Sequence, residues 1–555
     1  MKLNNFIARP LLAASILLLL NGCGGGGGGF PFGGSAENGL SLAAGDVSCH
    51  AEPAVQCQSS LRAQPIARLY EGGFKWSEGA GTSVVRDINR IKQTDGSWLF
   101  HIDYKSGLAA GVYRGTVTIT IPLLSPFGDS INPVSFNYTL TVAANNGNFT
   151  QLTRVANDWE GFNGNAAHSG FVPVTLDPAS FNRRFSRVSP DNTRFDKMAL
   201  LDGKLLLISR EVPSAATAPN TTPPVNPALQ SVREQDNTLA WRVAGTPAAT
   251  YLNLAASGQQ VLVTSAESTG RLLSSFDSDS GNLRFSRNDS YSRFLSSSNE
   301  MAPSVAGGMI CANNGTEGEL QCLNAASGAL LWRASLRGAL DPVFQSSAPA
   351  ISDTLVMTNQ NATFSAFERS SGSLRFALPV PGPASGSIQT THELNQAVVA
   401  VDANSALLLD RRNLNGSPRD NTISMVDLNT RQIRWQATGQ FTAHPVAARG
   451  VVYVGNHKTQ SIEARDVTSG AVLWSWALPA QNDDAFGDNL IVTNNLLFVA
   501  AKHNTYALDL ASHQAVWSYH FAGKLALSGQ GVLYILGADP DPVVLRDWVV
   551  AINLR

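Results

Sequence analysis

The sequence contains few of the residues that most often carry chemistry. Its 555 residues include five cysteines and nine histidines, and charged residues make up 15% of the chain. No Cys-x-x-Cys-His, His-Glu-x-x-His or Gly-x-Ser-x-Gly motif occurs, so the sequence signatures of haem attachment, zinc peptidases and serine hydrolases are missing. The 40 Lys and Arg against 42 Asp and Glu give a net charge of −2 without a basic run. We therefore expect no nucleic acid partner.

Glycine, proline and apolar residues are plentiful instead. The chain has 48 Gly, 27 Pro and 43% hydrophobic residues, a composition that favours a turn-rich globular protein with mostly β structure. Its length exceeds what one ordinary core needs, so several domains or a large repeat architecture are expected.

The N-terminus has the features of an export signal. Lys2 and Arg9 precede the apolar run "LLAASILLLL", which is too short for a comfortable membrane-spanning helix. The following "LNGC" and six glycines resemble the lipobox of bacterial lipoproteins. This resemblance implies a signal peptide over 1–22, lipidation of Cys23, a Gly-rich tether over 23–37, and sorting to the outer membrane because Gly24 follows the cysteine. The alternative is an ordinary cleaved signal peptide with an incidental cysteine.

The remaining four cysteines form two local pairs. Cys49 lies near Cys57, and Cys311 and Cys322 flank a polar loop between two expected antiparallel strands. In an exported chain both pairs predict disulfides. Buried free thiols are the alternative.

Residues 38–147 show short alternating runs such as "SWLFHIDY" and "VSFNYTLTV". This pattern predicts a small β-sandwich. The segment "GLAAGVYRGTVTIT" and the closing "VSFNYTLTVAAN" resemble the final hairpin of bacterial immunoglobulin-like modules.

From residue 150 onward the chain repeats a turn followed by an aromatic strand. Successive copies lie 39 to 59 residues apart, room for four short strands each, which predicts an eight-bladed β-propeller over 150–555. The eight aromatic positions are Phe185, Trp241, Phe285, Trp332, Phe376, Trp435, Trp474 and Trp517. Glycine stands four residues earlier at Gly281, Gly328, Gly372 and Gly470, with Phe181, Asn237, Arg431 and His513 in the other copies. A polar acceptor stands eight residues earlier, at Asp177, Asp277, Asn324, Glu368, Asp427, Asp466 and Asp509, and only Arg233 departs from the pattern.

Each repeated residue has a structural task. We expect the Asp or Asn to accept backbone N–H groups, the Gly to adopt the left-handed conformation, and the aromatic ring to pack between neighbouring blades. A ligand site would not need eight dispersed copies, so the motif is interpreted as a joint. The end of the chain, "DWVVAINLR", lacks a turn and aromatic strand, whereas "LDPASFNRRFSRV" supplies both without a preceding partner. The last blade should therefore be completed by the first segment.

Together with "DWEGFNGNAAHSGFVPVTLDP", these repeats resemble the pyrroloquinoline-quinone-like β-propeller family. That family includes quinone-dependent dehydrogenases and non-enzymatic lipoproteins of the outer-membrane assembly machinery, so the fold alone does not decide activity. The quinone enzymes usually carry adjacent cysteines beside the cofactor and Glu, Asn and Asp ligands for calcium. This chain has no Cys-Cys pair.

Few other residues could bind a metal or act in catalysis. The histidines are single residues on different repeats, without the spacing of metal ligands. The acidic runs at 483–488 and 539–542 lack the pattern of a calcium loop, so we interpret them as exposed turns. We therefore expect no metal and no cofactor. The first hypothesis is a non-enzymatic envelope lipoprotein that binds protein partners and is attached to the membrane by its lipid. A divergent quinone-dependent oxidoreductase and a carbohydrate-binding surface protein are the alternatives.

Overall fold

The computed structural model describes residues 40–42, 46–51, 57–65, 74–79, 83–93, 96–105, 107–120, 133–144, 146–212, 226–246, 250–267, 270–287, 302–314, 319–336, 347–360, 363–380, 397–410, 420–479, 483–540 and 545–555. These residues form an all-β protein, as predicted, with ten four-stranded sheets and one short 3-10 turn at Pro178–Ser180. No helix among them is long and apolar enough to cross a membrane.

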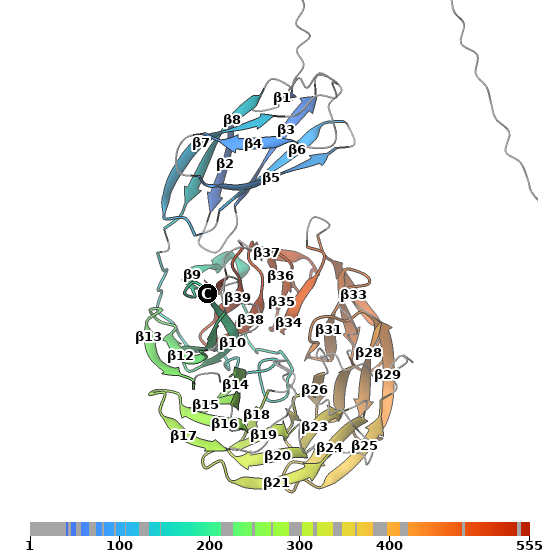
Figure 1. The fold of residues 1–555 in the computed structure, drawn as a ribbon. Coiled ribbons are helices and arrows are strands. Elements are labelled where there is room, and N and C mark those ends of the chain that lie inside the picture. Colours follow the sequence, from blue (N-terminus) through green and yellow to red (C-terminus); the bar gives the residue numbers. More distant parts are fainter. Residues whose placement is uncertain are drawn as a thin grey trace, which may run out of the picture.

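Two sheets with a common apolar core form the N-terminal part of the chain (Figure 1). Their strand orders are β1-β3-β6-β5 and β2-β8-β7-β4. The strands are β1 (Leu40–Leu42), β2 (Asp46–Ala51), β3 (Gln58–Pro65), β4 (Lys75–Glu78), β5 (Val85–Lys92), β6 (Trp98–Tyr104), β7 (Gly111–Thr120) and β8 (Val134–Val142). Inward side chains such as Phe100, Phe136 and Leu140 are fully buried, because alternate residues of each strand face the space between the sheets.

The other eight sheets are arranged around a common centre as the blades of a propeller (Figure 1). We number them in chain order, so that blade 1 contains β10 to β13 and blade 8 contains β38, β39, β40 and β9. Blades 1 to 4 consist of β10 (Thr193–Leu201), β11 (Lys204–Glu211), β12 (Ala228–Arg233), β13 (Leu239–Ala244), β14 (Thr250–Ser257), β15 (Gln260–Glu267), β16 (Gly270–Asp277), β17 (Leu283–Arg287), β18 (Ser304–Ala306), β19 (Met309–Asn314), β20 (Glu319–Asn324), β21 (Leu330–Ser335), β22 (Ala350–Ile351), β23 (Leu355–Gln360), β24 (Thr363–Glu368) and β25 (Leu374–Pro379).

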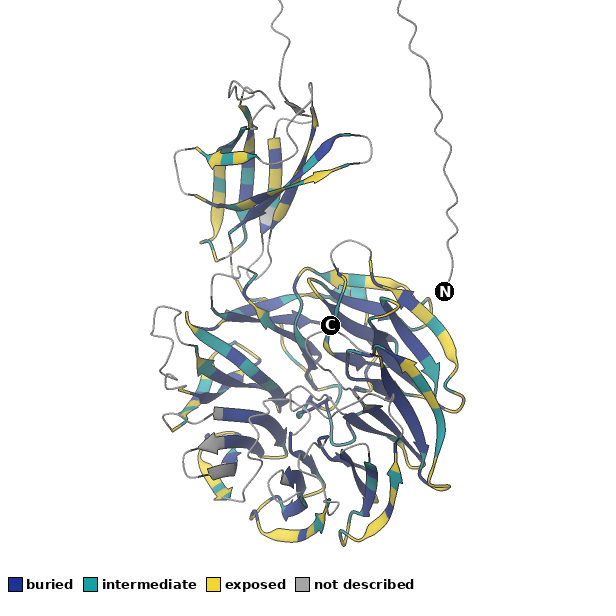
Figure 2. Cartoon of the chain, turned by 45° about the vertical axis from the view of Figure 1, so that its right-hand side comes forward, coloured by how far each residue is buried: buried dark blue, intermediate teal, exposed yellow. Residues whose placement is uncertain are grey.

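Blades 5 to 8 follow the same antiparallel order, with the first strand of each nearest the centre. They consist of β26 (Ala397–Asp402), β27 (Ser405–Asp410), β28 (Asn421–Asp427), β29 (Gln432–Gly439), β30 (Val446–Ala448), β31 (Val451–Asn456), β32 (Ser461–Asp466), β33 (Val472–Ala477), β34 (Phe486–Val492), β35 (Leu496–Ala501), β36 (Thr505–Asp509), β37 (Ala515–Tyr519), β38 (Lys524–Leu527), β39 (Val532–Ala538), β40 (Asp547–Asn553) and β9 (Asn182–Val188). Figure 2 shows buried residues concentrated in the inner strands and exposed residues on the outermost ones.

The ring closes between the two ends of the propeller sequence. Strand β9 pairs antiparallel with β40, so that Phe185 lies opposite Ala551. Arg184 reinforces this closure: it is fully buried, and its guanidinium donates to the carbonyls of Thr150, Glu234 and Gln235 and to Asn553 Oδ1. The predicted completion of the last blade by the first segment is confirmed.

The sandwich contacts blade 8 of the propeller. Arg86 donates to the carbonyl of Pro540 at 3.0 Å and pairs with Asp103 at 3.2 Å. The guanidinium of Arg546 lies so close to Gly107 that a side chain at this glycine would collide with it. The two parts therefore meet at the loop that follows β39.

Candidate functional site

A single stretch of chain crosses the propeller at its centre (Figure 1). We call residues 155–176 the crossing segment; it has no helix or regular strand. Its backbone carbonyls accept hydrogen bonds from the innermost strands of six blades at 2.6 to 2.9 Å. The acceptor carbonyls belong to Trp159, Glu160, Ala166, Ala167, Ser169 and Gly170, and the donor N–H groups belong to Leu200, Ala256, Ile351, Ala400, Ala447 and Val492 in blades 1, 2, 4, 5, 6 and 7.

Blade 8 is joined to the crossing segment through Gly529. The N–H of Val155 donates to the Gly529 carbonyl at 2.7 Å, and the N–H of Gly529 donates to Asp158 Oδ1 at 2.6 Å. Asp158 Oδ2 also accepts from the N–H of Asp202 in blade 1 at 2.9 Å. The buried carboxylate thus bridges the first and last blades.

His168 connects the crossing segment to blades 3 and 5. Its Nδ1 lies 3.0 Å from the carbonyl of Val398, and its Nε2 lies 2.9 Å from Ser304 Oγ. A carbonyl can only accept, so Nδ1 carries the proton and Nε2 accepts from the serine hydroxyl. Every blade therefore has at least one hydrogen bond to the crossing segment.

The Ser304–His168 pair has the connectivity of a nucleophile and a base, but it is closed to substrate. His168 and Ser304 are 1% and 4% exposed, and the space beside Ser304 has a volume of only about 10 Å³, the size of one water molecule. Burial lowers the pKa of His168 to about 4, so the imidazole is neutral near pH 7. These features make the pair a structural contact.

A second cavity, of about 60 Å³, lies between the crossing segment and the inner strands. Its lining includes Trp159, Asn163, Lys197, Asp488 and Lys524. Asn163 is 5% exposed; its Nδ2 donates to the carbonyls of His168 and Pro445, whereas its Oδ1 has no hydrogen-bond partner. At roughly 10–15 Å³ per water-sized probe, the cavity holds a handful of water molecules.

The quinone cofactor that the family resemblance suggests does not fit this arrangement. Pyrroloquinoline quinone is a three-ring tricarboxylic acid, far larger than the cavity of about 60 Å³. Adjacent cysteines are missing from the sequence, and the described residues include no group of three His, Cys, Asp or Glu that could hold a metal ion. Within the described part of the chain, the residues around the cavity therefore support neither quinone stacking nor calcium coordination.

Two carboxyl groups near the crossing segment have raised pKa values. Burial, and secondly the charge of Asp158, raises the pKa of Glu160 to about 7. Burial also raises the pKa of the fully buried Glu234 to about 7. Glu160 belongs to the crossing segment and lies beside Ser257 of blade 2. Glu234 of blade 1 lies beside Ser528 and Tyr534 of blade 8. Both carboxyl groups are therefore buried at contacts that hold the blades in place.

The repeated residues lie at the outer joints of the blades. In five copies the acceptor side chain binds the backbone N–H groups two and three residues later, at 2.7 to 3.1 Å. These acceptors are Asp277, Asn324, Asp427, Asp466 and Asp509. The glycines Gly281, Gly328, Gly372 and Gly470 all have φ between +70° and +73°. The following aromatics, Phe285, Trp332, Phe376, Trp435, Trp474 and Trp517, stand on the outermost strands.

Each aromatic ring packs on the turn of the next blade. A Cβ placed on Gly470 would approach the ring of Trp435 within 2.6 Å, and Gly281, Gly328 and Gly372 lie equally close to the preceding ring. The indole N–H of Trp435 donates to the Val467 carbonyl at 2.8 Å. The glycine is therefore required both by its backbone conformation and by the ring above it.

In three of the four copies without glycine, the substitute side chain contacts the preceding ring. His513 stacks on Trp474 with a centroid distance of 4.6 Å, Phe181 meets Trp517 edge-on at 5.5 Å, and the Arg431 guanidinium lies 5.9 Å from the Phe376 ring. All of these contacts are between blades. The repeated turns and aromatic rings therefore connect neighbouring blades, as expected of a joint.

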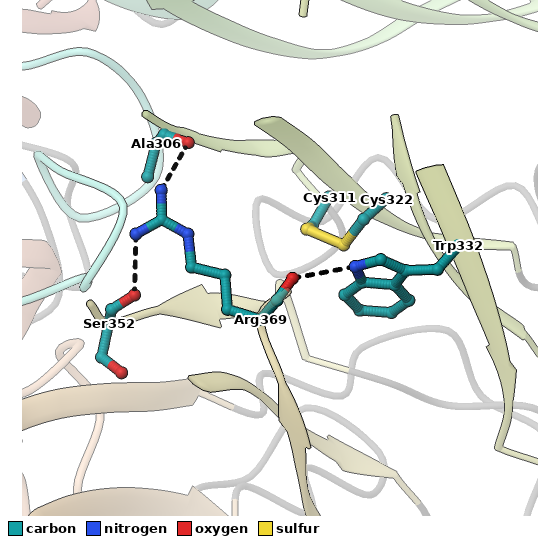
Figure 3. The surroundings of a disulfide bond; sticks show 6 residues. All are labelled: Ala306, Cys311, Cys322, Trp332, Ser352 and Arg369. Atoms are coloured by element: carbon teal, nitrogen blue, oxygen red, sulfur yellow. Dashed lines mark hydrogen bonds between the residues drawn. A yellow bond between two sulfur atoms is a disulfide. The ribbon is translucent and has the colours of Figure 1, made fainter. Parts of the chain in front are cut away.

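Both cysteine pairs are joined in the structure. Cys311 and Cys322 lie directly opposite each other on β19 and β20, with their Cα atoms 4.2 Å apart and both side chains fully buried. Figure 3 shows this disulfide beside Trp332, whose indole donates to the Arg369 carbonyl of blade 4 at 2.9 Å. Cys49 and Cys57 are joined in the sandwich. Cys23 lies outside the described residues, so its lipidation stays a prediction.

The interpretation of the acidic runs as exposed turns was wrong for two residues. Asp483 is 2% exposed and accepts from the N–H of His503 and from the Tyr506 hydroxyl. Asp539 is 6% exposed and accepts from Arg546 Nε and Trp548 Nε1. The chain's own donors satisfy these carboxylates, which accounts for their burial.

The fold and joints define a propeller whose repeats follow a known family pattern. The family model described as outer membrane protein assembly factor BamB matches residues 228–476 and 317–551. These overlapping matches run from 228 to 551, more than half of the 555 residues. The chain belongs to this family, which confirms the propeller family expected from the repeats.

Individual relatives are distant. Tetrathionate hydrolase of Acidithiobacillus ferrooxidans is 19% identical over 241 residues, which are 42% of this chain and 39% of that protein, so the chain spans about two-fifths of its length. The solved structure of BamB from Moraxella catarrhalis is 13% identical with a TM-score of 0.47, covering 67% of this chain and 99% of that one. Quinohemoprotein alcohol dehydrogenase ADHIIG from Pseudomonas putida HK5 is 10% identical with a TM-score of 0.48, covering 72% and 80%.

Proposed function

We propose that this chain is a non-enzymatic lipoprotein of the bacterial cell envelope that acts as a scaffold for protein partners, with outer-membrane assembly as the first process to examine. The crossing segment carries this proposal. It fills the centre of the propeller and bonds to the blades, and it leaves a cavity of about 60 Å³. A propeller filled by its own chain has its outer surface, rather than its channel, available for recognition.

Family membership supports the same proposal, because the family is described by an outer-membrane assembly factor. The proposed anchor follows from the lipobox-like "LNGC" and the glycines after it. A lipid on Cys23 would hold the chain at the membrane and the glycines would act as a flexible spacer. Replacement of Cys23 by Ser should therefore release correctly cleaved protein into the soluble envelope fraction. Membrane retention of that variant would reject the lipid anchor.

The test of the scaffold is cross-linking of the full-length protein in intact cells, followed by identification of the attached proteins. The matched control carries the same first 37 residues on an unrelated soluble domain, because this chimaera shares the anchor but not the propeller. We expect envelope proteins that attach to the full chain and not to the control. Identical attachment to both would contradict a partner-binding propeller.

Catalysis is tested directly with purified full-length protein. After incubation with pyrroloquinoline quinone and calcium, we expect neither retained cofactor nor reduction of an artificial dye by alcohols, aldoses or aldehydes. Stoichiometric quinone retention together with dye reduction would favour the oxidoreductase hypothesis over the scaffold. Binding of glycans without turnover, and without protein partners, would instead favour the carbohydrate-binding alternative.

A further inference from the structure

The turn acceptor of a blade is commonly neutralised by an arginine seven residues later. Asp277 pairs with Arg284 at 2.7 Å in blade 2, and Asp427 pairs with Arg434 at 2.7 Å in blade 5. Glu368 and Arg375 lie 3.7 Å apart in blade 4. In blade 3 the acceptor is the uncharged Asn324 and the seventh residue is Leu331. In blades 2, 4 and 5 the acidic acceptor thus comes with an arginine, whereas the neutral acceptor of blade 3 comes with leucine.

Blades 6 and 7 break this pairing. Their acceptors, Asp466 and Asp509, are acidic, but the seventh residues are Leu473 and Val516. Among the described residues, no lysine or arginine forms an ion pair with either aspartate. Arg465, the neighbour of Asp466 in sequence, turns to Glu463 and to the Gly470 carbonyl instead. Two adjacent blades therefore carry an acceptor carboxylate without the cation found elsewhere.

The positions that would hold those arginines are exposed and aliphatic. Leu473 is 54% exposed and Val516 is 46% exposed. They stand on β33 and β37, the outermost strands of their sheets, and each of these strands pairs with a neighbour on one side only. Neither strand contains a charged residue, whereas the outermost strands of the other six blades all carry arginine. Charges on edge strands normally discourage pairing with foreign strands.

Blade 8 differs from blades 6 and 7 at the seventh position. Asp177 likewise forms no ion pair with an arginine in the described part of the chain, but its seventh residue is Arg184, which is fully buried in the ring closure. An exposed aliphatic residue beside an unpaired acceptor therefore occurs in blades 6 and 7. Hydrogen bonds from Ser512 make the largest contribution to lowering the pKa of Asp509, and His513, whose ring stacks on Trp474, makes the smallest.

We propose that the outer edges of blades 6 and 7, defined by Asp466, Leu473, Asp509 and Val516, are a docking surface for an extended basic segment of a protein partner. The partner's Lys or Arg heads would pair with the two aspartates, as Arg284 and Arg434 do within their own blades. The methylene stems of these side chains would cover Leu473 and Val516. The free backbone edges of β33 and β37 suit an extended chain. This proposal rests on the proposed scaffold function and names the surface that performs it.

The test introduces arginine at the two positions of blades 6 and 7 that lack it. Leu473→Arg with Val516→Arg places a cation seven residues after each acidic acceptor, as in blades 2 and 5, so the variant should fold as well as the natural chain. The probe is a short labelled peptide of alternating lysine and valine, titrated against full-length protein in detergent. We expect the variant to bind the peptide at least about tenfold more weakly, because its own arginines compete for the aspartates.

Two controls separate this surface from general charge effects. Leu331→Arg adds the same side chain to blade 3, where the acceptor is Asn324, and should leave peptide binding within about twofold. A peptide of alternating glutamate and valine should bind neither protein. Equal weakening by Leu331→Arg, equal binding of both peptides, or no binding of the lysine peptide to the natural chain would each overturn the proposal.

The scaffold and its docking surface can fail separately. If cross-linked partners are still recovered in cells with Leu473→Arg and Val516→Arg, the scaffold function stands and this surface is wrong. If the peptide binds as expected but no partner is recovered from cells, the surface is real and the scaffold function is wrong. Binding of vesicles of anionic lipid in place of the peptide would contradict both charge complementarity and the proposal.

Discussion

The inner and outer ends of the blades are held together in different ways. At the inner end one crossing segment supplies a different residue to every blade, from Trp159 in blade 1 to Gly170 in blade 7. At the outer end one turn and one aromatic strand recur eight times. The repeated joint tolerates exceptions, since His513 and Arg431 replace glycine and still contact the preceding ring. The inner contacts do not follow a repeated sequence, so each is made by a residue that has no counterpart in the other blades.

The largest expected loss at the outer end comes from removing an aromatic ring. Trp332→Ala should lower the free energy of unfolding of the propeller by about 3–5 kcal/mol, the usual range for a buried aromatic residue. Trp332 is 8% exposed and its indole donates to Arg369 of the next blade. The measurement is the midpoint of denaturant unfolding. Leu331→Ala, at a neighbour that is 49% exposed, should change it by less than about 0.5 kcal/mol, and an equal loss in both variants would contradict the joint.

Loss of the propeller disulfide should cost somewhat less. Replacement of Cys311 and Cys322 by Ala opens a loop with a sequence separation of 11, for which chain entropy gives about 3 kcal/mol. The matched variant replaces Cys49 and Cys57 and should destabilise the sandwich while leaving propeller unfolding unchanged. Peptide mapping without reductant checks the pairing directly. Recovery of free thiols at 311 and 322 from exported protein would remove the reason for the effect.

The outer end could be predicted from the sequence because its signal is repeated. The recurrence of Asp, Gly and an aromatic residue at fixed spacing gave the strands, the turns and the neighbours of each ring. The unpaired ends of the repeat likewise predicted the pairing of β9 with β40. Such a repeat can be recognised without an alignment of homologues, because its copies can be compared with one another within the chain.

The inner end could not be predicted in this way. His168 was one histidine among nine, and nothing in its neighbourhood indicated bonds to Ser304 and Val398, which lie 136 and 230 residues away. Besides the family resemblance of this stretch, a local signal was the small residues within 161–170, a composition that lets a chain approach the strands closely. The burial of Asp483 and Asp539 was missed for another reason: their donors lie nearby in sequence, 7 residues away for Arg546 and 20 for His503, but no sequence pattern marks them as partners.

Removal of a single inner contact tests whether that end lacks redundancy. His168→Ala should lower the free energy of unfolding by about 2–3 kcal/mol, because it leaves a cavity and removes the partners of Ser304 and Val398. The control, His503→Ala, changes an exposed histidine and should have little effect.

The same variant should alter the dependence of stability on pH. Burial lowers the pKa of His168 from 6.5 to about 4 in the folded protein, so folding favours the neutral imidazole. Its stabilising contribution is present above about pH 6.5 and is lost as the pH falls toward 4. The natural protein should therefore lose stability over this window more steeply than His168→Ala. Parallel pH profiles of the two proteins would contradict the burial of a neutral histidine.

A smaller effect is expected from a methyl group at the outer turn. Gly470→Ala should lower the free energy of unfolding by about 1–2 kcal/mol because of its left-handed backbone. The contact with Trp435 leaves no room for a Cβ and should lower it further. Gly450→Ala isolates the first contribution, because Gly450 has φ +79° but nothing within 4 Å of the added methyl. Denaturant midpoints of the two variants give the difference. If both variants lose equal stability, the ring above Gly470 does not restrict the turn.

The smallest effect should come from restoring glycine where the repeat lacks it. His513→Gly relieves a positive φ of 59° but removes a ring stacked on Trp474 at 4.6 Å and 16°. Relief of the backbone is favourable by about 1 kcal/mol, and loss of an aromatic pair is unfavourable by about 0.5–1.5 kcal/mol. The two contributions nearly cancel, so we expect a change within about 0.5 kcal/mol, measured by the same unfolding midpoint. His513→Ala keeps the strained backbone and loses the ring, so it should be the less stable of the two variants. A large loss in His513→Gly would mean that the stacked imidazole, rather than the turn conformation, holds blades 6 and 7 together, and the outer end would then depend on single contacts as the inner end does.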